Sequence, residues 1–297
     1  MNIKEFAEKN QAAVSAALSR EVSLNEKLKL NGIRSYALTV TESENDLSPN
    51  IYLEPFYEKF QIDNSLETAV DSIISTYRRD RLKEPVSMEW LQDFSQVRDK
   101  VFYFLINYEA NRELLGQIPH SRYLDLAVVF GVRCSLEGIR PGSIILCHSH
   151  LGMWGITAKD LAAIAQENTP KICPVRLSNM ADCIPGNGGI PSPGDTDPIL
   201  EPLSHMYVLS NACGSYGAAA LCYGNTLKGF SELMGADTLV LPESIHKAVL
   251  VPLKDSAGME PYREMFRSIN GGCHDPQGFL SNSIYLYKRD TGQIEIA

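Results

Sequence analysis

The stretch DTLVLPESIHKAVLVPL, residues 237–253, holds two apolar segments separated by a short polar junction. Leucine and valine dominate both DTLVLPE (237–243) and HKAVLVPL (246–253), and this composition indicates two strands. Strands that follow one another so closely pair as antiparallel neighbours, because a parallel pair needs a much longer crossover. The stretch therefore predicts antiparallel sheet in the C-terminal part of the chain.

Neighbouring strands with helices between them recur along the sequence. The order strand, strand, helix is predicted over 34–41, 50–60 and 65–79, and again over 121–134, 142–149 and 156–168, where Thr157 and Asp160 form a capping-box pattern. Further predictions are a helix over 2–19, a strand over 205–211, a helix over 217–235, another over 260–270, and a closing hairpin that turns at Asp290-Thr291-Gly292. This alternation predicts an α+β fold in which helices pack on largely antiparallel sheets.

Residues 184–203 interrupt this pattern, with five prolines and four glycines in twenty residues. Such a composition disfavours helix and strand, so a long connection is expected there. It would join an N-terminal α+β region, 1–183, to a C-terminal α+β region, 204–297. The alternative, one continuous domain, stays open.

Composition restricts the compartment and the partners. The chain of 297 residues carries 27 Lys and Arg against 36 Asp and Glu, a net charge of −9 that disfavours binding to a nucleic-acid backbone. No apolar run is long enough to span a membrane, and the N-terminal segment is charged and amphipathic, unlike a signal peptide. Seven scattered cysteines without a CxxC pair argue against a disulfide framework and a zinc ribbon. We expect a cytoplasmic protein with reduced thiols.

The segment CHSHLG, residues 147–152, has features of two active sites. His148 and His150 would lie on one side of a strand end, with Ser149 opposite, as in the first metal ligands of some hydrolases. Two ligands do not make a site, and the other candidates, His205, His246, Cys273, His274 and Asp275, stand at no diagnostic spacing. Cys147 and Leu151 replace the glycines of a nucleophile elbow at Ser149. We therefore expect a structural strand end and no metal.

A second candidate is the glycine-rich segment NACGSYGAAAL, residues 211–221. Ser215, Asp237 and His246 follow one another in the order of a hydrolase triad, but the 31 residues from Ser215 to His246 leave little room for that scaffold. A glycine-permitted turn is the favoured interpretation. Its backbone N–H groups at Gly214, Ser215 and Gly217 would suit an anion or a carbonyl oxygen.

Glu243 and His246 lie together at the junction between the two strands quoted first. We interpret this junction as a kink, with catalysis as the alternative.

Several blocks resemble an uncharacterised bacterial family known only as a domain of unknown function. These blocks cover most of the chain after the first helix: NIYLEPFYEKF, NRELLGQIPHSRYLDLAVVF, MWGITAKDLAAIAQENTP, MYVLSNACGSYGAAAL and LVLPESIHKAVLVP. The LPESIHK block departs from the family pattern at Glu243 and Lys247, where the pattern has a serine and an acid. The resemblance implies a bacterial cytoplasmic protein and no particular mechanism.

The sequence thus predicts a non-enzymatic binding or regulatory protein that acts on a protein or small molecule, without a cofactor, nucleic acid or membrane. Whether it is a homo-oligomer stays open. The alternatives are a metal-dependent hydrolase that uses His148 and His150, and a serine hydrolase at Ser215.

Overall fold

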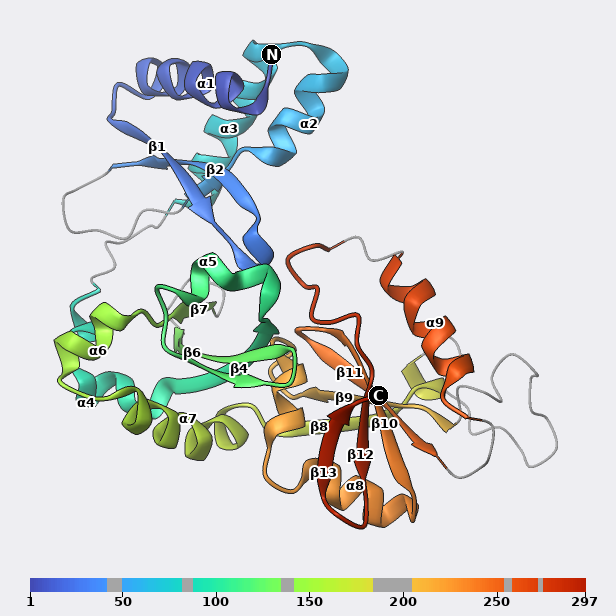
Figure 1. Cartoon of the computed structure of the whole chain (residues 1–297). Helices are drawn as coiled ribbons and strands as arrows, with labels where there is room; N and C mark the ends of the chain where they lie inside the picture. Colours follow the sequence, from blue (N-terminus) through green and yellow to red (C-terminus); the bar gives the residue numbers. More distant parts are fainter. Residues whose placement is uncertain (42–49, 82–87, 135–141, 184–204, 254–257, 272–274) are drawn as a thin grey trace. The chain divides into compact units, whose positions relative to one another are not determined.

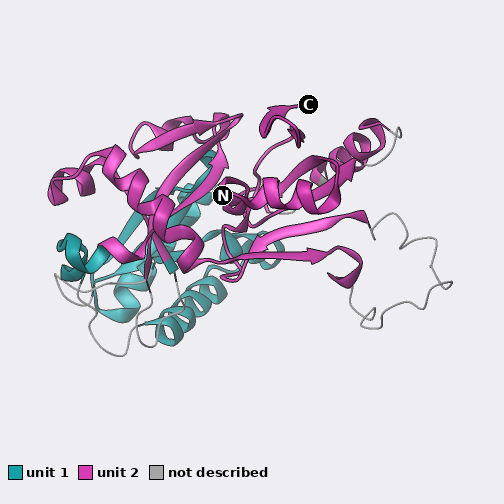
Figure 2. Ribbon diagram, turned by 90° about the horizontal axis from the view of Figure 1, so that it is seen from below, with its two compact units in different colours: residues 1–97, 135–142 teal, residues 98–134, 143–297 magenta. Residues whose placement is uncertain are grey.

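The computed structural model describes residues 1–41, 50–81, 88–134, 142–183, 205–253, 258–271 and 275–297. The chain forms two compact units (Figure 2). Unit 1 comprises Met1–Val97 and Ser135–Gly142, and unit 2 comprises Arg98–Cys134 and Ser143–Ala297. Each unit is therefore built from two separate stretches of the chain.

Unit 1 consists of three main helices and a three-stranded antiparallel sheet of order β1-β2-β3 (Figure 1). The side chains of Phe6, Leu38, Leu53 and Ile73 are fully buried in its core. Its elements are α1 (Ile3–Leu18), β1 (Val22–Leu28), η1 (Leu30–Gly32), β2 (Arg34–Val40), β3 (Asn50–Tyr52), α2 (Glu54–Asp63), α3 (Leu66–Asp80), η2 (Glu89–Leu91) and α4 (Phe94–Val97).

The first sheet of unit 2 has four strands: three follow the order β4-β6-β5, and the fourth, β7, also pairs with β6. Every residue of its strand β4 is buried, and Thr169 of α7 accepts a hydrogen bond from the backbone N–H of Tyr103 at 3.0 Å. This first part of unit 2 contains η3 (Arg98–Lys100), β4 (Val101–Asn107), η4 (Glu109–Asn111), α5 (Arg112–Leu115), β5 (His120–Tyr123), β6 (Leu126–Cys134), β7 (Gly142–Ile145), α6 (His148–Trp154) and α7 (Ala158–Ile172).

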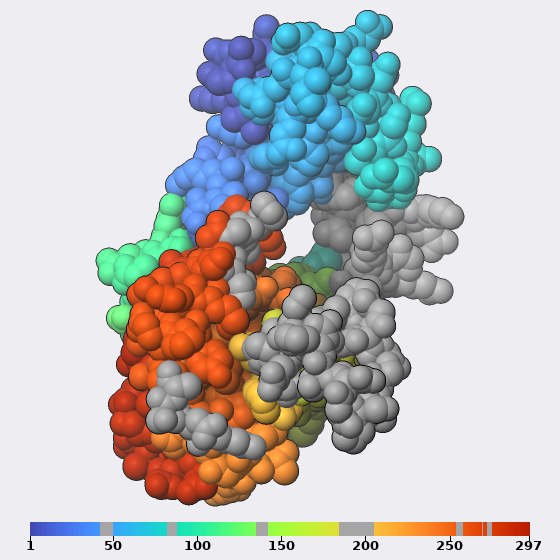
Figure 3. Space-filling view, turned by 90° about the vertical axis from the view of Figure 1, so that its right-hand side faces the viewer, coloured from blue at the N-terminus to red at the C-terminus, as the bar shows by residue number. Residues whose placement is uncertain are grey.

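The second sheet of unit 2 has six antiparallel strands in the order β13-β12-β10-β11-β9-β8. Phe266 of α9 packs against Leu239, Leu241 and Val249 on one face of this sheet, and the outer side of α9 forms part of the surface (Figure 3). The elements are β8 (Val175–Asn179), η5 (Ala181–Cys183), β9 (Tyr207–Asn211), η7 (Gly217–Cys222), α8 (Thr226–Met234), β10 (Asp237–Ser244), β11 (Lys247–Leu253), α9 (Glu260–Gly271), β12 (Tyr285–Lys288) and β13 (Gln293–Ile296).

The α+β class and the antiparallel sheets are confirmed, including the β10–β11 pair from which the prediction started. Four predicted elements differ. The strand expected over 142–149 ends at Ile145. Residues 50–60 form a strand only as far as Tyr52, and helix α2 begins two residues later. Pro55 lies in the first turn of α2, where the backbone N–H that proline lacks would have no partner within the helix. Residues 121–134 form two strands that reverse at Leu124, whose φ is 57°. Residues 217–235 form η7 and α8, with Tyr223–Asn225 between them.

The two units differ from the expected regions 1–183 and 204–297. Strand β8, before the Pro- and Gly-rich stretch, pairs with β9, after it, in one sheet of unit 2. This pairing places both sides of the stretch in the same unit, whereas the boundary between units falls at Val97. The predicted long connection, 184–203, lies outside the described residues.

Candidate functional site

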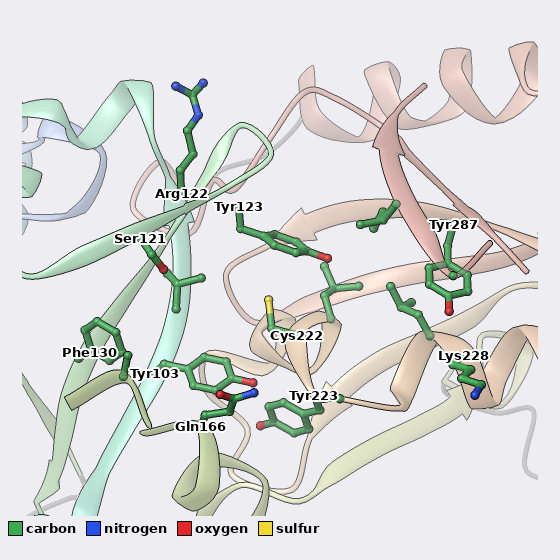
Figure 4. A pocket seen from close by; sticks show the side chains of 17 residues that line it. Tyr103, Ser121, Arg122, Tyr123, Phe130, Gln166, Cys222, Tyr223, Lys228 and Tyr287 are labelled. Atoms are coloured by element: carbon green, nitrogen blue, oxygen red, sulfur yellow. The ribbon is translucent and has the colours of Figure 1, made fainter. Parts of the chain in front are cut away.

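A cavity of about 440 Å³ lies in unit 2, between its two sheets (Figure 4). Strands β4 to β6 supply one side, η7 and α8 the opposite side, and α7 and the β12–β13 hairpin further walls. The lining residues are Tyr103, Ser121, Arg122, Tyr123, Val128, Phe130, Ala162, Gln166, Leu221, Cys222, Tyr223, Gly224, Leu227, Lys228, Tyr287, Gly292 and Ile294. This volume lies within the range of about 300–1,000 Å³ that is typical of small-molecule sites.

The lining of the cavity is rich in tyrosine. Four tyrosines from different elements contribute to it: Tyr103, Tyr123, Tyr223 and Tyr287. The rings of Tyr103 and Tyr123 extend from the first sheet toward the wall that carries Cys222 and Tyr223 (Figure 4). Tyr223 meets Tyr103 edge to face at 6.1 Å, and its hydroxyl donates to the carbonyl of Cys173 at 2.8 Å. The hydroxyls of Tyr103, Tyr123 and Tyr287 have no hydrogen-bond partner among the residues that the structure describes.

Burial favours the neutral forms of Tyr103, Tyr123 and Cys222. Desolvation raises the pKa of the Tyr103 and Tyr123 phenols above their ordinary value, and the nearby Cys222 adds to both shifts. Burial also raises the pKa of the Cys222 thiol to about 12. Near neutral pH these three residues therefore present two O–H donors and an unreactive thiol.

The charged residues that line the cavity are both basic, Arg122 and Lys228. The Arg122 guanidinium lies 4.5 Å from the centre of the Tyr108 ring and donates to the carbonyl of Leu124, and it is directed away from the cavity (Figure 4). Among the residues that the structure describes, the Lys228 ammonium forms one ion pair, a long one of 3.9 Å with Glu232 on the next turn of α8. The absence of a carboxylate among the lining residues makes the cavity suitable for a ligand that is rich in hydrogen-bond acceptors.

Two parts of the predicted serine site meet away from the cavity, where the loop after β9, which contains Ser215, approaches His246 in the turn between β10 and β11. The Tyr216 N–H donates to His246 Nδ1 at 3.2 Å, and the Asn211 side chain donates to the carbonyl of Ser215 at 2.9 Å. Within the described chain, no hydrogen bond joins the Ser215 hydroxyl to His246. Asp237 begins β10, whereas His246 follows its other end, so a strand roughly 20 Å long separates them.

The other residues of this predicted site have structural partners. Gly214 is in the left-handed region with a φ of 68°, and Gly217 opens η7 against the backbone of His246. Glu243 forms an ion pair with Lys247 at 3.3 Å, across the turn. Its Oε2 is buried without a hydrogen-bond partner in the described chain.

The prediction that His148 and His150 end a strand is wrong. β7 stops at Ile145, and the two histidines lie in the first turn of α6. His150 Nδ1 accepts the N–H of Cys147 at 2.9 Å and thus caps the helix, whereas His148 and Ser149 are exposed. The described residues contain no group of three His, Cys, Asp or Glu arranged to hold a metal. Cys273 and His274 lie outside those residues.

Sequence analysis did not identify the tyrosine cavity. Its phenols come from positions 103, 123, 223 and 287, and no motif spacing connects segments so distant. The only signal in the sequence is compositional, because the chain has 13 tyrosines and 2 tryptophans.

Comparison with known proteins places the chain in a family. No helix in the described part of the chain is both long and apolar enough to cross a membrane. No curated protein and no solved structure matches the chain. A family model described as a family of unknown function (DUF5688) matches residues 3–289, nearly the whole sequence. The chain therefore belongs to the DUF5688 family.

Proposed function

We propose that this protein binds a small organic molecule in the tyrosine cavity, and that the ligand has a flat apolar body and a carboxylate. The observation that carries the proposal is the set of unpartnered phenol hydroxyls of Tyr103, Tyr123 and Tyr287 in a cavity of about 440 Å³. Hydroxyls that line a cavity and have no protein partner can bond to water or to a ligand, so a cavity that groups three such donors favours a bound acceptor.

The walls also indicate the shape and charge of the ligand. Aromatic and aliphatic side chains dominate the lining, and they favour an apolar body, above all a flat ring that can pack against tyrosine. The phenols of Tyr103 and Tyr123 stay neutral and can donate, and Lys228, which also has a 3.9 Å contact with Glu232, contributes a positive charge. A carboxylate fits these donors better than an ammonium group.

This proposal is a specific form of the expectation of a non-enzymatic binding protein. The net charge of −9 disfavours binding to nucleic acid, as expected from the sequence. The six described cysteines are free thiols, which is compatible with the bacterial cytoplasm. The charged residues that line the cavity are basic, although the protein as a whole is acidic.

Three probes with the same naphthalene ring test the charge preference: 2-naphthoate, 2-naphthamide and 2-naphthylmethylamine. Binding to the full chain, measured by calorimetry or ligand-observed NMR, is expected to be strongest for the carboxylate and weakest for the amine. Tyr103→Phe or Tyr123→Phe should weaken naphthoate binding about fivefold, as expected for the loss of one hydrogen bond. Tyr207→Phe is the matched control, because Tyr207 packs on Phe230 and does not line the cavity.

Gly224→Leu provides a steric test at the same site. Gly224 lines the cavity, and a Cβ there would meet no atom within 4 Å, so a side chain can begin at this position without moving the backbone. Loss of naphthoate binding in this variant, with binding kept in Gly152→Leu, would support the cavity as the site. Equal binding of all three probes, or binding that Gly224→Leu leaves unchanged, would refute the proposal.

A further inference from the structure

Two cysteines of unit 2 lie unusually close together. Cys173 follows the last residue of α7, and Cys213 lies in the loop after β9. Their Sγ atoms are 2.7 Å apart, with Cys173 as donor, and both are free thiols. An S–S bond is about 2.05 Å long, so the two sulfur atoms need to approach by only about 0.7 Å to bond.

The backbone holds the two cysteines side by side. The N–H of Ala212 donates to the carbonyl of Pro174 at 2.8 Å, and the next residues, Val175 and Asn211, are partners in the antiparallel β8–β9 ladder. Cys173 directly precedes Pro174, and Cys213 directly follows Ala212, so each cysteine is the chain neighbour of a residue that forms this hydrogen bond. The proximity of the sulfurs follows from the sheet and does not depend on a side-chain rotamer alone.

The surroundings give the two thiols different roles. Cys173 is buried, and Arg133 Nη1 lies 3.6 Å from its sulfur. Cys213 is half-buried and donates to the carbonyl of Ile172 at 3.2 Å. Burial raises the pKa of Cys173, and the hydrogen bond with Cys213 raises it further. Cys213 is therefore the thiol that reacts with a molecule from solution, and Cys173 is the thiol that follows.

We propose that Cys173 and Cys213 form a reversible dithiol–disulfide pair that exchanges with low-molecular-weight disulfides. In the first step the Cys213 thiolate attacks one sulfur of the small disulfide, and the other half leaves as a thiolate. Cys173 then loses its proton and attacks the Cys213 sulfur, which releases the second half as a thiol. The protein loses two hydrogens, and the small disulfide is reduced to two thiols.

The other described cysteines lack such a neighbour. Cys134 donates to the carbonyl of Val132 and Cys183 to that of Asn179, and no second sulfur accepts from either in the described part of the chain. Cys183 is exposed and Cys134 is half-buried. They provide controls for reaction with the same reagent without formation of an internal disulfide.

The test equilibrates the full chain with mixtures of reduced and oxidised glutathione, blocks free thiols with N-ethylmaleimide and maps the products by mass spectrometry. We expect a cross-linked peptide pair containing Cys173 and Cys213, and its complete reversal by dithiothreitol. Cys173→Ser should leave glutathione attached to Cys213, because the thiol that releases it is gone. Cys213→Ser should leave Cys173 unmodified, and Cys183→Ser should still form the disulfide.

Two results with the unaltered chain would overturn the proposal. One is a glutathione adduct on Cys213 that never converts to the internal disulfide. The other is that both thiols remain free in the most oxidising mixture, in which exposed Cys183 is modified. Neither result depends on ligand binding, so this proposal and the proposed function succeed or fail separately.

Discussion

Gly217 shows how one residue can determine the packing of a whole loop. A Cβ at this position would lie 2.3 Å from the carbonyl oxygen of His246 and 2.9 Å from the backbone N of Asn211. Both contacts are with backbone atoms, which cannot rotate away as a side chain can. The loop after β9 and the turn between β10 and β11 therefore need a residue without a side chain here.

Gly217→Ala should destabilise the protein by about 3 kcal/mol, because the added methyl group must push one of two backbone segments aside. Urea denaturation followed by circular dichroism measures this loss. Gly152→Ala is the control, since a Cβ at Gly152 would meet no atom within 4 Å. Equal stability of the two variants would show that the loop has more freedom than these contacts indicate.

The sequence identified Gly217 but not the reason for it. Sequence analysis considered the glycines around Ser215 as an anion site at a permitted turn. The structure places the backbone of His246, 29 positions later, against Gly217. Such a reason cannot be derived from local sequence, because it depends on how two distant loops meet.

Helix starts show which elements can be predicted from sequence. Thr157 and Asp160 form a capping box at the start of α7, as predicted, with the Asp160 N–H donating to Thr157 Oγ1 at 3.2 Å. Both partners lie within one turn, so the signal is local. The start of α6 was missed because its capping box consists of Cys147 at the N-cap and His150 three residues later, and neither residue is usual in these roles. The apolar run before it predicted a longer strand.

Thr157→Ala should cost about 1 kcal/mol of stability, the usual loss for a helix N-cap, and Thr157→Ser should restore most of it. Thermal unfolding at neutral pH checks both variants. Hydrogen bonds from Thr157 lower the pKa of Asp160, so their contribution is present above the ordinary pKa of an aspartate and is lost as the pH falls through the lowered value. The difference between Thr157→Ala and the parent should therefore shrink in acid.

At the largest scale, Asp125 joins parts of unit 2 that are far apart in sequence. Its carboxylate accepts hydrogen bonds from Ser281 Oγ and from the Tyr285 hydroxyl, each at 2.6 Å. Asp125 lies in the turn between β5 and β6 and Tyr285 in β12, so the two sheets of unit 2 are connected through one side chain. Sequence analysis could predict the strands of both sheets but not this connection. The tyrosine cavity was missed for the same reason, because its walls come from both sheets.

A double-mutant cycle of Asp125→Ala and Tyr285→Phe should reveal a coupling of about 2 kcal/mol, since a hydrogen bond to a charged group contributes about 1.5–3 kcal/mol. Chemical denaturation of the parent, both single variants and the double variant supplies the four values. Asp290→Ala serves as the control, because Asp290 forms an exposed pair with the neighbouring Arg289. Additive losses from the two single variants would show that the 2.6 Å contact contributes little.

The hydrogen bonds of Asp125 also determine when the two sheets of unit 2 can be joined during synthesis of the chain. Their partners lie 156 and 160 positions further along the chain, so on the ribosome they are made on the order of ten seconds after Asp125 itself. The buried core of unit 1, by contrast, draws only on positions 6 to 77 and is available early. During synthesis, β4 can pack on α7 once residue 172 has been made, but the hydrogen bonds from β12 to the turn between β5 and β6 cannot form until Tyr285 has been made. In that interval the first sheet of unit 2 lacks its link to the second sheet, and the tyrosine cavity lacks the wall that the β12–β13 hairpin supplies.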